Sequence, residues 1–351
     1  MHFLAVLVSL ITCHGGPADH FASFAECLIE EGYEVELYAS GPALKTFEAR
    51  NIAAMYFDAE SSSNATQIAK RCSKSAAVIT DAGHPFDIPL QEALSKEAPE
   101  TIHIAYYDNP EPFVPGGYSK TASKVMAFAQ KTLFANANLA KETLYEDLTT
   151  EIDLPFEKRI GLGYYPISRA EKIAEKRTPK KNLLVYFGGN NEEYFEKAFP
   201  SFLKTLSEAC KIVNLSKFEI ILQQHPGAKA KNIDGMQLEE WIKKHAGNSK
   251  APRVSLSEKS SEEVLLLADT VLYYQTSMGP LFALAGISTI QVGHKTYEDL
   301  LIKSGLCRSA TNSFDFIDAL EERKPPSDGA VLFEKLGINK EWFKALKDAL
   351  Q

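Results

Sequence analysis

Residues that could hold a phosphate group follow two apolar segments in the second half of the chain. FEIILQQ is followed by His225 and Gly227, and LADTVLYYQ by Thr276, Ser277 and Gly279 before the apolar LFALAG. Open α/β sheets bind ligands beyond the carboxyl ends of their strands, and the first amides of a helix favour phosphate. The pattern predicts a phosphate subsite to which the His225 ring donates a hydrogen bond. The competing interpretations are that His225 satisfies a nearby carbonyl group and that the hydroxyl groups only cap the helix.

A glycine pair after an earlier apolar segment, NLLVYF, offers a third contact. Gly188 and Gly189 carry no Cβ, so that the backbone can approach a ligand, and Asn190 follows them where a helix is expected to begin. A tight turn between a strand and a helix would use the same glycines, and both interpretations stay open. Ser260 and Glu263 instead form a capping box, to which we assign no chemistry.

The first half of the chain carries candidates for a catalytic base. His14 and His20 lie in the segment after the first apolar run, where a helix is expected to begin. A histidine at such a place can accept the proton of a hydroxyl group near neutral pH. We take His20 as the first candidate and His14 as the second.

A second polar loop in this half is TDAGHP, in which Asp81 and His84 follow the apolar AAVI. Asp81 can act as the base itself or orient a histidine, and the choice among these residues stays open. A third loop, after TIHIAYY, holds Asp108, Asn109 and Glu111 and is a candidate contact for an acceptor. The alternative is that these side chains only satisfy the ends of a sheet.

The spacing of apolar residues predicts the elements that position these loops. Between Pro17 and Glu31 apolar residues recur at helical intervals until Gly32, whereas the short apolar runs are typical of buried strands. This alternation predicts a doubly wound parallel sheet with right-handed crossovers. The expected strands are residues 3–11, 33–39, 52–57, 76–80 and 101–107, and the expected helices are 17–31, 64–73 and 87–97.

The pattern restarts after the polar, basic stretch SRAEKIAEKRTPKK. We therefore predict two Rossmann-like domains that face each other across a cleft, at residues 1–166 and 181–335, with a C-terminal helix at 339–351 joined to the first. The expected strands of the second domain are 183–187, 218–223, 252–256, 270–274 and 288–292, and its helices are 191–209, 235–246, 261–268, 279–286 and 297–305.

Composition excludes some classes of function. Of the 351 residues, 45% are hydrophobic and 24% charged, as in ordinary globular proteins. The formal net charge of -8 argues against a nucleic-acid partner, because backbone binding relies on clustered Lys and Arg, although a local basic patch could still meet a membrane-bound acceptor. The five cysteines show no C-x-x-C spacing, which indicates a reducing compartment and a cytoplasmic protein. FLAVLVSLI is too short to span a bilayer and is expected to form a strand.

Four segments together resemble the donor-binding half of the GT-B glycosyltransferases. They are GGN at 188–190, HPG at 225–227, SSEEVLLLADTVLYYQTS and ALAGISTIQVG. The HP element and the later Ser element are most similar to those of bacterial sialyltransferases, polysialyltransferases and teichoic-acid glycerophosphotransferases. The resemblance implies that the second domain binds a nucleotide-sugar donor and that the acceptor enters from the first. Such sialyltransferases take their base from an acidic pair followed by Gly, and Asp81-Ala82-Gly83 matches only its first and last positions.

One departure concerns the ribose of the donor. Many UDP-sugar enzymes of this fold, including the 2-epimerases, carry a Glu shortly after the Ser or Gly element, where this chain reads PLFALAG. A CMP-type donor and a divergent UDP site both stay open.

We therefore expect a glycosyltransferase that moves a sugar from a nucleotide-sugar to a hydroxyl acceptor, which is a glycan, a lipid-linked compound or a small molecule. The eight His and five Cys show no metal-ligand cluster, so we expect neither a metal nor another cofactor. Two alternatives remain: an epimerase or hydrolase of nucleotide-sugars, and a non-catalytic protein that binds nucleotide-sugars.

Overall fold

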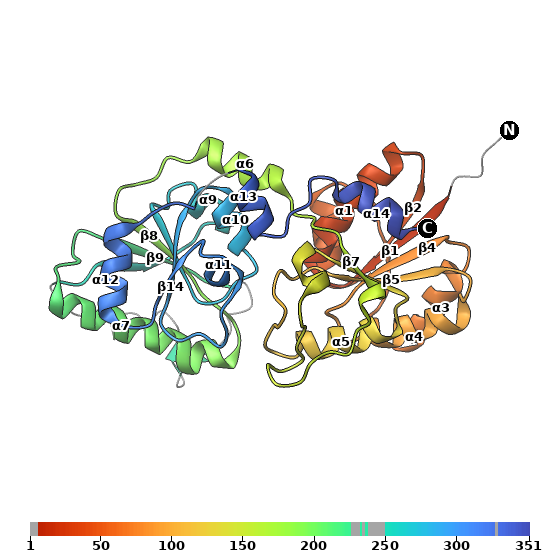
Figure 1. The fold of residues 1–351 in the computed structure, drawn as a ribbon, viewed down its shortest axis with the longest axis horizontal. Coiled ribbons are helices and arrows are strands. Elements are labelled where there is room, and N and C mark those ends of the chain that lie inside the picture. Colours follow the sequence, from red (N-terminus) through yellow and green to blue (C-terminus); the bar gives the residue numbers. More distant parts are fainter. Residues whose placement is uncertain (1–5, 226–231, 234–235, 238–249, 327–328) are drawn as a thin grey trace. The chain divides into compact units, whose positions relative to one another are not determined.

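The chain folds into two units, each built around a sheet of its own. In this computed structural model the described residues are 6–225, 232–233, 236–237, 250–326 and 329–351. The N-terminal unit comprises Met1–Tyr165 and Gly337–Gln351, and the C-terminal unit comprises Pro166–Leu336 (Figure 1). The chain therefore leaves the first unit after Tyr165 and returns to it at Gly337.

A seven-stranded parallel sheet forms the centre of the N-terminal unit. Its strands are β1 (Leu7–Thr12), β2 (Glu34–Ala39), β3 (Met55–Tyr56), β4 (Ala77–Asp81), β5 (Ile102–Tyr107), β6 (Lys131–Phe134) and β7 (Arg159–Gly161). They are arranged in the order β3-β2-β1-β4-β5-β6-β7, and all neighbouring pairs are parallel. The chain order reverses between β1 and β4, and such a switch point is where open α/β sheets bind ligands.

Helices cover both faces of this sheet, which explains why its central strands are buried along almost their entire length. They are α1 (Gly15–Glu30), α2 (Pro42–Ala49), α3 (Ser63–Cys72), α4 (Asp87–Glu97), α5 (Tyr118–Phe128) and α14 (Trp342–Ala349). α1 and α14 lie on one face, and α3, α4 and α5 on the other (Figure 1). The Trp342 ring completes the first face, because its centroid lies 4.5 Å from that of Tyr164 and 5.4 Å from that of Phe24.

A six-stranded parallel sheet forms the C-terminal unit. Its strands are β8 (Leu183–Phe187), β9 (Glu219–Gln223), β12 (Arg253–Leu256), β13 (Thr270–Tyr273), β14 (Ser288–Val292) and β15 (Arg308–Ala310). Their order is β12-β9-β8-β13-β14-β15, so that the switch point lies between β8 and β13. The loops that carry Gly188 and Thr276 both follow strands at this point.

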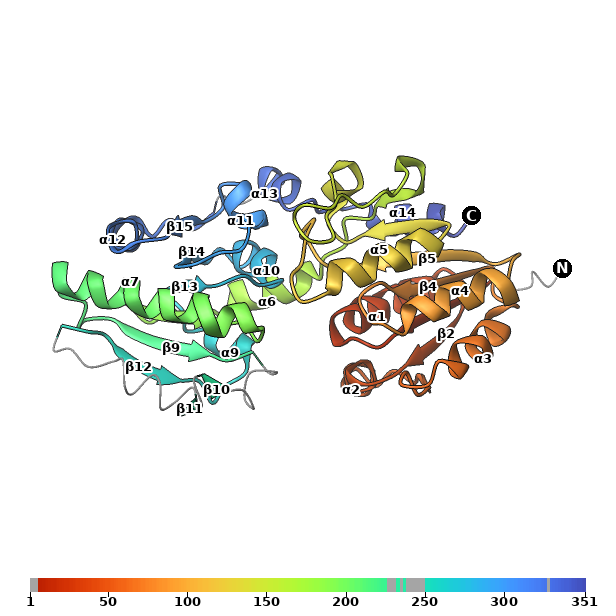
Figure 2. The ribbon, with the colours of Figure 1, turned by 90° about the horizontal axis from the view of Figure 1, so that it is seen from below.

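The helices of the C-terminal unit are α6 (Ile167–Lys176), α7 (Phe199–Ile212), α9 (Ser261–Leu265), α10 (Gly279–Leu284), α11 (Leu300–Lys303), α12 (Ser313–Glu322) and α13 (Ala330–Lys335). Figure 2 shows α7 lying across one face of the sheet, where the Phe202 ring stacks on Tyr186 with centroids 4.1 Å apart. Most of the basic stretch forms α6, and its end is held by Arg177, whose guanidinium group donates to the carbonyl groups of Ala268 and Gly286 at 2.9 and 3.2 Å.

The predicted fold class, two Rossmann-like doubly wound domains, is confirmed. The predicted helix 191–209 instead begins with a π-helical turn at Tyr194–Ala198, and α10 ends at Leu284 rather than at residue 286. The predicted helix 235–246 lies mostly outside the described residues, and its described part is wrong, because Met236–Gln237 forms strand β11 against β10 (Asn232–Ile233). Among the residues that the structure describes, no helix is both long and apolar enough to cross a membrane.

Candidate functional site

Asp81 organises the switch point of the N-terminal sheet. It lies at the carboxyl end of β4 and is fully buried. Its Oδ2 atom accepts hydrogen bonds from the Thr12 hydroxyl group at 2.5 Å and from the Cys13 amide at 3.1 Å, and a longer one from the His14 amide at 3.4 Å. Three donors of one loop converge on one oxygen, so the loop after β1 is built around the Asp81 carboxylate.

A second buried carboxyl group, that of Asp87, lies at the first residue of α4. Burial raises the pKa of Asp87 well above its ordinary value, and the charge of Asp81 raises it further. Burial also acts to raise the pKa of Asp81, but the hydrogen bond with Asp87, the charge of His14 and the Thr12 hydroxyl group together hold it below its ordinary value. The two pKa shifts favour one proton on Asp87 and one negative charge on Asp81. The sequence did not single out Asp87, because an acid in the first turn of a helix is common.

Two histidines border this pair of carboxyl groups. His14 precedes α1, and its Nδ1 atom lies 3.7 Å from Asp81 Oδ2. The His84 ring meets the His14 ring edge-on, with centroids 5.3 Å apart. Burial lowers the pKa of His84, and the proximity of His14 lowers it further. The structure thus brings Asp81, His14 and His84 together.

His20, the first candidate for the base, lies in different surroundings. It lies roughly 9 Å further along the axis of α1 than His14, as the rise per residue of an α-helix gives. Its Nδ1 atom lies 2.7 Å from the hydroxyl oxygen of the buried Tyr106, and its ring meets that of Tyr164 edge-on at 4.9 Å between centroids. These aromatic contacts occupy the Nδ1 side of His20, and a role of His20 as the base stays a prediction.

Asp108, after β5, extends the cluster. It is half-buried, and its Oδ1 atom accepts a hydrogen bond from the Tyr118 hydroxyl group at 2.5 Å. Burial raises the pKa of Asp108 to about 6, although the bond from Tyr118 acts to lower it, and the charges of Asp81 and His14 also act on it. Gly83 makes room for Tyr118, because a Cβ at residue 83 would lie 2.2 Å from the Tyr118 ring. Because the charges of Asp81 and His14 act on the pKa of Asp108, the three side chains belong to one cluster.

The other polar residues of that loop form a turn. The Asn109 side chain accepts a hydrogen bond from the Glu111 amide at 3.1 Å, and the Tyr107 hydroxyl group donates to the Glu111 carbonyl group at 2.8 Å. Contact of Asn109 or Glu111 with an acceptor stays a prediction.

The glycine pair after β8 lies against an aromatic ring. A Cβ on Gly188 would lie 2.3 Å from the Tyr194 hydroxyl oxygen. One on Gly189 would lie 3.1 Å from the Tyr194 Cβ atom and 3.2 Å from the Tyr274 ring. Tyr194 therefore packs directly against both glycines, and contact with a ligand at Gly188, Gly189 or Asn190 stays a prediction.

Thr276, Ser277 and Gly279 lie between β13 and α10 and differ in their surroundings. The Thr276 hydroxyl oxygen accepts a hydrogen bond from the Met278 amide at 3.2 Å, so it supports the turn. Gly279 is buried, and a Cβ there would lie 3.1 Å from the Leu301 side chain on α11. Ser277 is exposed, and of the three predicted residues it is the most open to a ligand.

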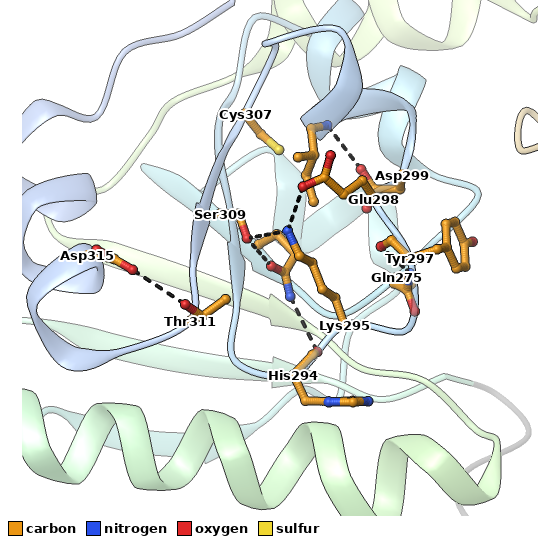
Figure 3. A network of polar contacts seen from close by, with 12 residues as sticks. Gln275, His294, Lys295, Tyr297, Glu298, Asp299, Cys307, Ser309, Thr311 and Asp315 are labelled. Atoms are coloured by element: carbon orange, nitrogen blue, oxygen red, sulfur yellow. Dashed lines mark hydrogen bonds and ion pairs between the residues drawn. The ribbon is translucent and has the colours of Figure 1, made fainter.

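The loop after β14, residues 293–299, belongs to the same end of the sheet and was not recognised in the sequence. Gln275 Nε2 donates to the Tyr297 carbonyl oxygen at 3.0 Å, which ties this loop to the one after β13 (Figure 3). The two carboxylate oxygens of the buried Asp299 accept from the Tyr273 hydroxyl group at 2.9 and 2.7 Å. The signal was a polar segment after the apolar ISTIQV, the same pattern that identified the other loops.

The charged residues of this loop are paired within the C-terminal unit. Lys295 Nζ lies 3.1 Å from Glu298 Oε1 and donates to the Ser309 hydroxyl oxygen at 3.3 Å (Figure 3). His294 Nε2 lies 2.8 Å from Glu193 Oε1. These contacts hold the shape of the loop.

His225 follows β9 at the carboxyl edge of the same sheet, whereas Gly227 lies outside the described residues. His225 is exposed as a whole, and partial burial of its ring lowers the pKa of the imidazole. Within the described part of the chain, no three His, Cys, Asp or Glu side chains are grouped as metal ligands. A cavity of about 290 Å³ beside Phe218 lies at the amino end of β9, away from the predicted site residues.

Comparisons with known proteins give likenesses of fold. No protein-family model matches the sequence, and no curated protein matches it either. A UDP-GlcNAc 2-epimerase structure from Methanocaldococcus jannaschii is similar, with a TM-score of 0.64 and 11% identity over 97% of this chain and 98% of that one. So is the Neisseria meningitidis enzyme bound to UDP-GlcNAc, with a TM-score of 0.64 and 11% identity over 98% of both chains. A glycosyltransferase from Rickettsia africae has a TM-score of 0.59 and 11% identity over 99% of this chain and 95% of that one.

These likenesses extend over both units of the chain. They show that it has the two-domain fold of the GT-B enzymes, as the resemblance predicted. The finer resemblance to sialyltransferases stays a prediction.

Proposed function

We propose that this protein is an enzyme that transfers a sugar from a nucleotide-sugar to a hydroxyl acceptor, with His14 as the base. The observation that carries the proposal is the pair formed by His14 and the buried Asp81 at the switch point of the N-terminal sheet, 3.7 Å apart. The His14 side chain is 38% exposed, so that a substrate can reach it. An imidazole that a carboxylate orients on one side and that is open on the other suits a general base.

In the proposed reaction, Nε2 of His14 takes the proton of the acceptor hydroxyl group while that oxygen forms a bond to the anomeric carbon of the donor. The bond from this carbon to the nucleotide diphosphate breaks, and its electron pair leaves with the diphosphate. The charge of Asp81 then balances the imidazolium that forms on His14.

The choice of a nucleotide-sugar rests on the C-terminal unit and on the comparisons. Ser277 and His225 follow strands at the carboxyl edge of the sheet, where doubly wound domains bind ligands. The similar structure from N. meningitidis is bound to UDP-GlcNAc, which makes a UDP-sugar the first donor to test. We propose that binding and transfer need no metal.

A nucleotide-sugar epimerase is the second candidate. Asp108, whose pKa burial raises to about 6, lies beside the pair of His14 and Asp81, and an epimerase needs two groups that exchange protons. Most of the similar structures are UDP-GlcNAc 2-epimerases, including those from M. jannaschii and N. meningitidis. The segment PLFALAG argues against this candidate, because it offers no acid to the ribose.

Donor turnover separates the candidates. The purified protein is incubated with UDP-, GDP-, CMP- and TDP-sugars, with and without hydroxyl acceptors, in the presence of a metal chelator. Acceptor-dependent release of nucleotide supports transfer, whereas a new epimer still attached to its nucleotide, detected by NMR, supports an epimerase. Release without acceptor indicates a hydrolase. Thermal stabilisation by a donor without any turnover would reject an enzyme in favour of a binding protein.

The base is tested by comparing His14→Ala with His20→Ala. His14→Ala should lower kcat by about 10²-fold or more, which is the usual contribution of a general base. His20→Ala should instead lower the melting temperature, because it removes the contacts with Tyr106 and Tyr164. Equal losses of kcat in the two folded variants would contradict the assignment of the base to His14.

A further inference from the structure

Two carboxyl groups are buried side by side under the candidate base. Asp81 and Asp87 are both fully buried, and no lysine or arginine of the described residues forms an ion pair with either. The titratable groups around them are Cys13 and His14 on the loop after β1, His84 on the loop before α4, Asp108 after β5 and Tyr118 on α5. Because no lysine or arginine among the described residues neutralises the pair, the protonation of each carboxyl group has to follow from its hydrogen bonds.

The hydrogen bonds of the four carboxyl oxygens of Asp81 and Asp87 favour a proton on Asp87. Asp87 Oδ2 accepts from the His84 amide at 2.9 Å, whereas Asp87 Oδ1 is buried and has no donor in the described part of the chain. Asp81 Oδ2 is engaged by the loop after β1, while Asp81 Oδ1 has only the Gly83 amide at 3.4 Å. Each carboxyl group shifts the pKa of the other as a hydrogen-bonded neighbour does, lowering that of Asp81 and raising that of Asp87. A proton on Asp87 Oδ1 would therefore give this buried oxygen a hydrogen bond to make, and Asp81 would gain an additional donor.

We propose that Asp87 is a positioning residue that keeps its proton on Oδ1 and donates a hydrogen bond to Asp81, which stays ionised and holds His14. Two ionised carboxylates in contact repel each other in a dry site, whereas an acid and a carboxylate carry a single charge. The catalytic meaning of Asp87 rests on the proposed function. The position of the proton concerns the N-terminal unit alone and is tested without turnover.

The first test is the pH dependence of stability in Asp87→Asn, whose amide offers a donor and an acceptor like those of the protonated acid. Asp87 in the wild type loses its proton above about pH 3.9 when the chain is unfolded but keeps it when folded. The contribution of Asp87 to the stability of the wild type therefore falls as pH rises above about 4. The unfolding equilibrium constant increases by up to tenfold per pH unit until the pKa of folded Asp87 is reached. Asn does not titrate, so the stability of Asp87→Asn relative to the wild type should increase with pH over this range.

Chemical denaturation of the full chain between pH 4 and 8 measures this gain. Asp153→Asn is the matched control, because Asp153 is exposed and the substitution removes a carboxyl group outside the buried pair. The proposal would be overturned if the stability of Asp87→Asn relative to the wild type stayed constant or decreased as pH rises.

The second test follows His14 by NMR of histidine-labelled protein, with its signal assigned from His14→Gln. If Asp87 is neutral, Asp87→Asn changes no charge near the ring, and the titration of His14 should match that of the wild type. If Asp87 is ionised, the substitution removes a negative charge, and the titration moves to lower pH. That second result would overturn the proposal.

Turnover gives the third readout. Asp87→Ala removes the donor to Asp81 and should lower kcat by about tenfold or more with little change in KM, and Asp87→Asn should recover a large part of that loss. A kcat for Asp87→Ala equal to that of Asp87→Asn would contradict the positioning role. Failure of every donor to react would reject the proposed function, while the stability and NMR results would still decide where the proton lies.

Discussion

Replacing Asp81 with Asn removes the charge at the centre of the N-terminal cluster and keeps the shape of the side chain. The amide oxygen can still accept from the Thr12 hydroxyl group and the Cys13 amide, which bond to Asp81 at 2.5 and 3.1 Å. A hydrogen bond to a charged group contributes about 1.5–3 kcal/mol, and a neutral one about 0.5–1.5 kcal/mol. With two such bonds, each weakened by about 1 kcal/mol, the free energy of unfolding should fall by about 2 kcal/mol at pH 7.

This loss corresponds to a decrease of roughly 4–8 °C in the melting temperature of a unit of this size. Its pH dependence follows from the direction of the pKa shift, because the pKa of folded Asp81 lies below its ordinary value. The stabilisation by the carboxylate is therefore present above about pH 4 and is lost as pH falls through the pKa of the folded state. The difference between Asp81→Asn and the wild type should shrink in the same range.

The activity of Asp81→Asn should fall with its stability, because the proposed base His14 loses the negative charge that lies 3.7 Å from its Nδ1 atom. We expect kcat to decrease by about 10²-fold or more with nucleotide affinity nearly unchanged. Thermal unfolding between pH 3 and 8 and steady-state kinetics measure the two effects, with Asp153→Asn as the control. A variant that melts with the wild type at pH 7 and turns over at the wild-type rate would refute the reasoning about this cluster.

Three further substitutions probe other parts of the site. Asp108→Asn should remove the change in kcat that ionisation of Asp108 causes near pH 6 in the wild type, and a pH profile identical to the wild type would exclude Asp108 from the reaction. Gly83→Ala places a Cβ 2.2 Å from the Tyr118 ring and should cost about 1–3 kcal/mol of stability; an unchanged melting temperature would show that the ring yields freely. His225→Ala should weaken nucleotide binding by about 1–3 kcal/mol in calorimetry, and equal affinity for every nucleotide that binds would reject its role.

The strand ends of the candidate site were predictable from the sequence. The strand expected at 76–80 is observed at Ala77–Asp81, and the strand expected at 3–11 is observed at Leu7–Thr12, with residues 3–5 outside the described part. Buried parallel strands appear in a sequence as apolar runs, and a polar residue directly after such a run lies at the carboxyl edge. This logic located both Asp81 and His14.

The sequence could not show which histidine meets Asp81. His14 and His20 both lie near the start of α1, and the outcome depends on the rotation of the helix against the sheet, which places His20 against Tyr106. Asp87 was missed for a related reason, because burial distinguishes it from an ordinary acid in the first turn of a helix.

Tertiary packing also limited the prediction of the C-terminal unit. Gly188 and Gly189 suggested an open approach for a ligand, but Tyr194, several residues further along the chain, packs against both. In the N-terminal unit, β6 was passed over because it has only Lys131–Phe134 and follows α5 closely, without a proline or glycine between them.

The return of the chain to the N-terminal unit bears on how the protein is made. The core of that unit begins with β1 and α1, yet Phe24 and Tyr164 lack the Trp342 ring until residues 337–351 have been synthesised. The C-terminal unit, Pro166–Leu336, is instead one continuous segment. We therefore expect the N-terminal unit to complete its core only with residues 337–351, and a chain cut near residue 336 to expose the apolar surface around Phe24 and Tyr164.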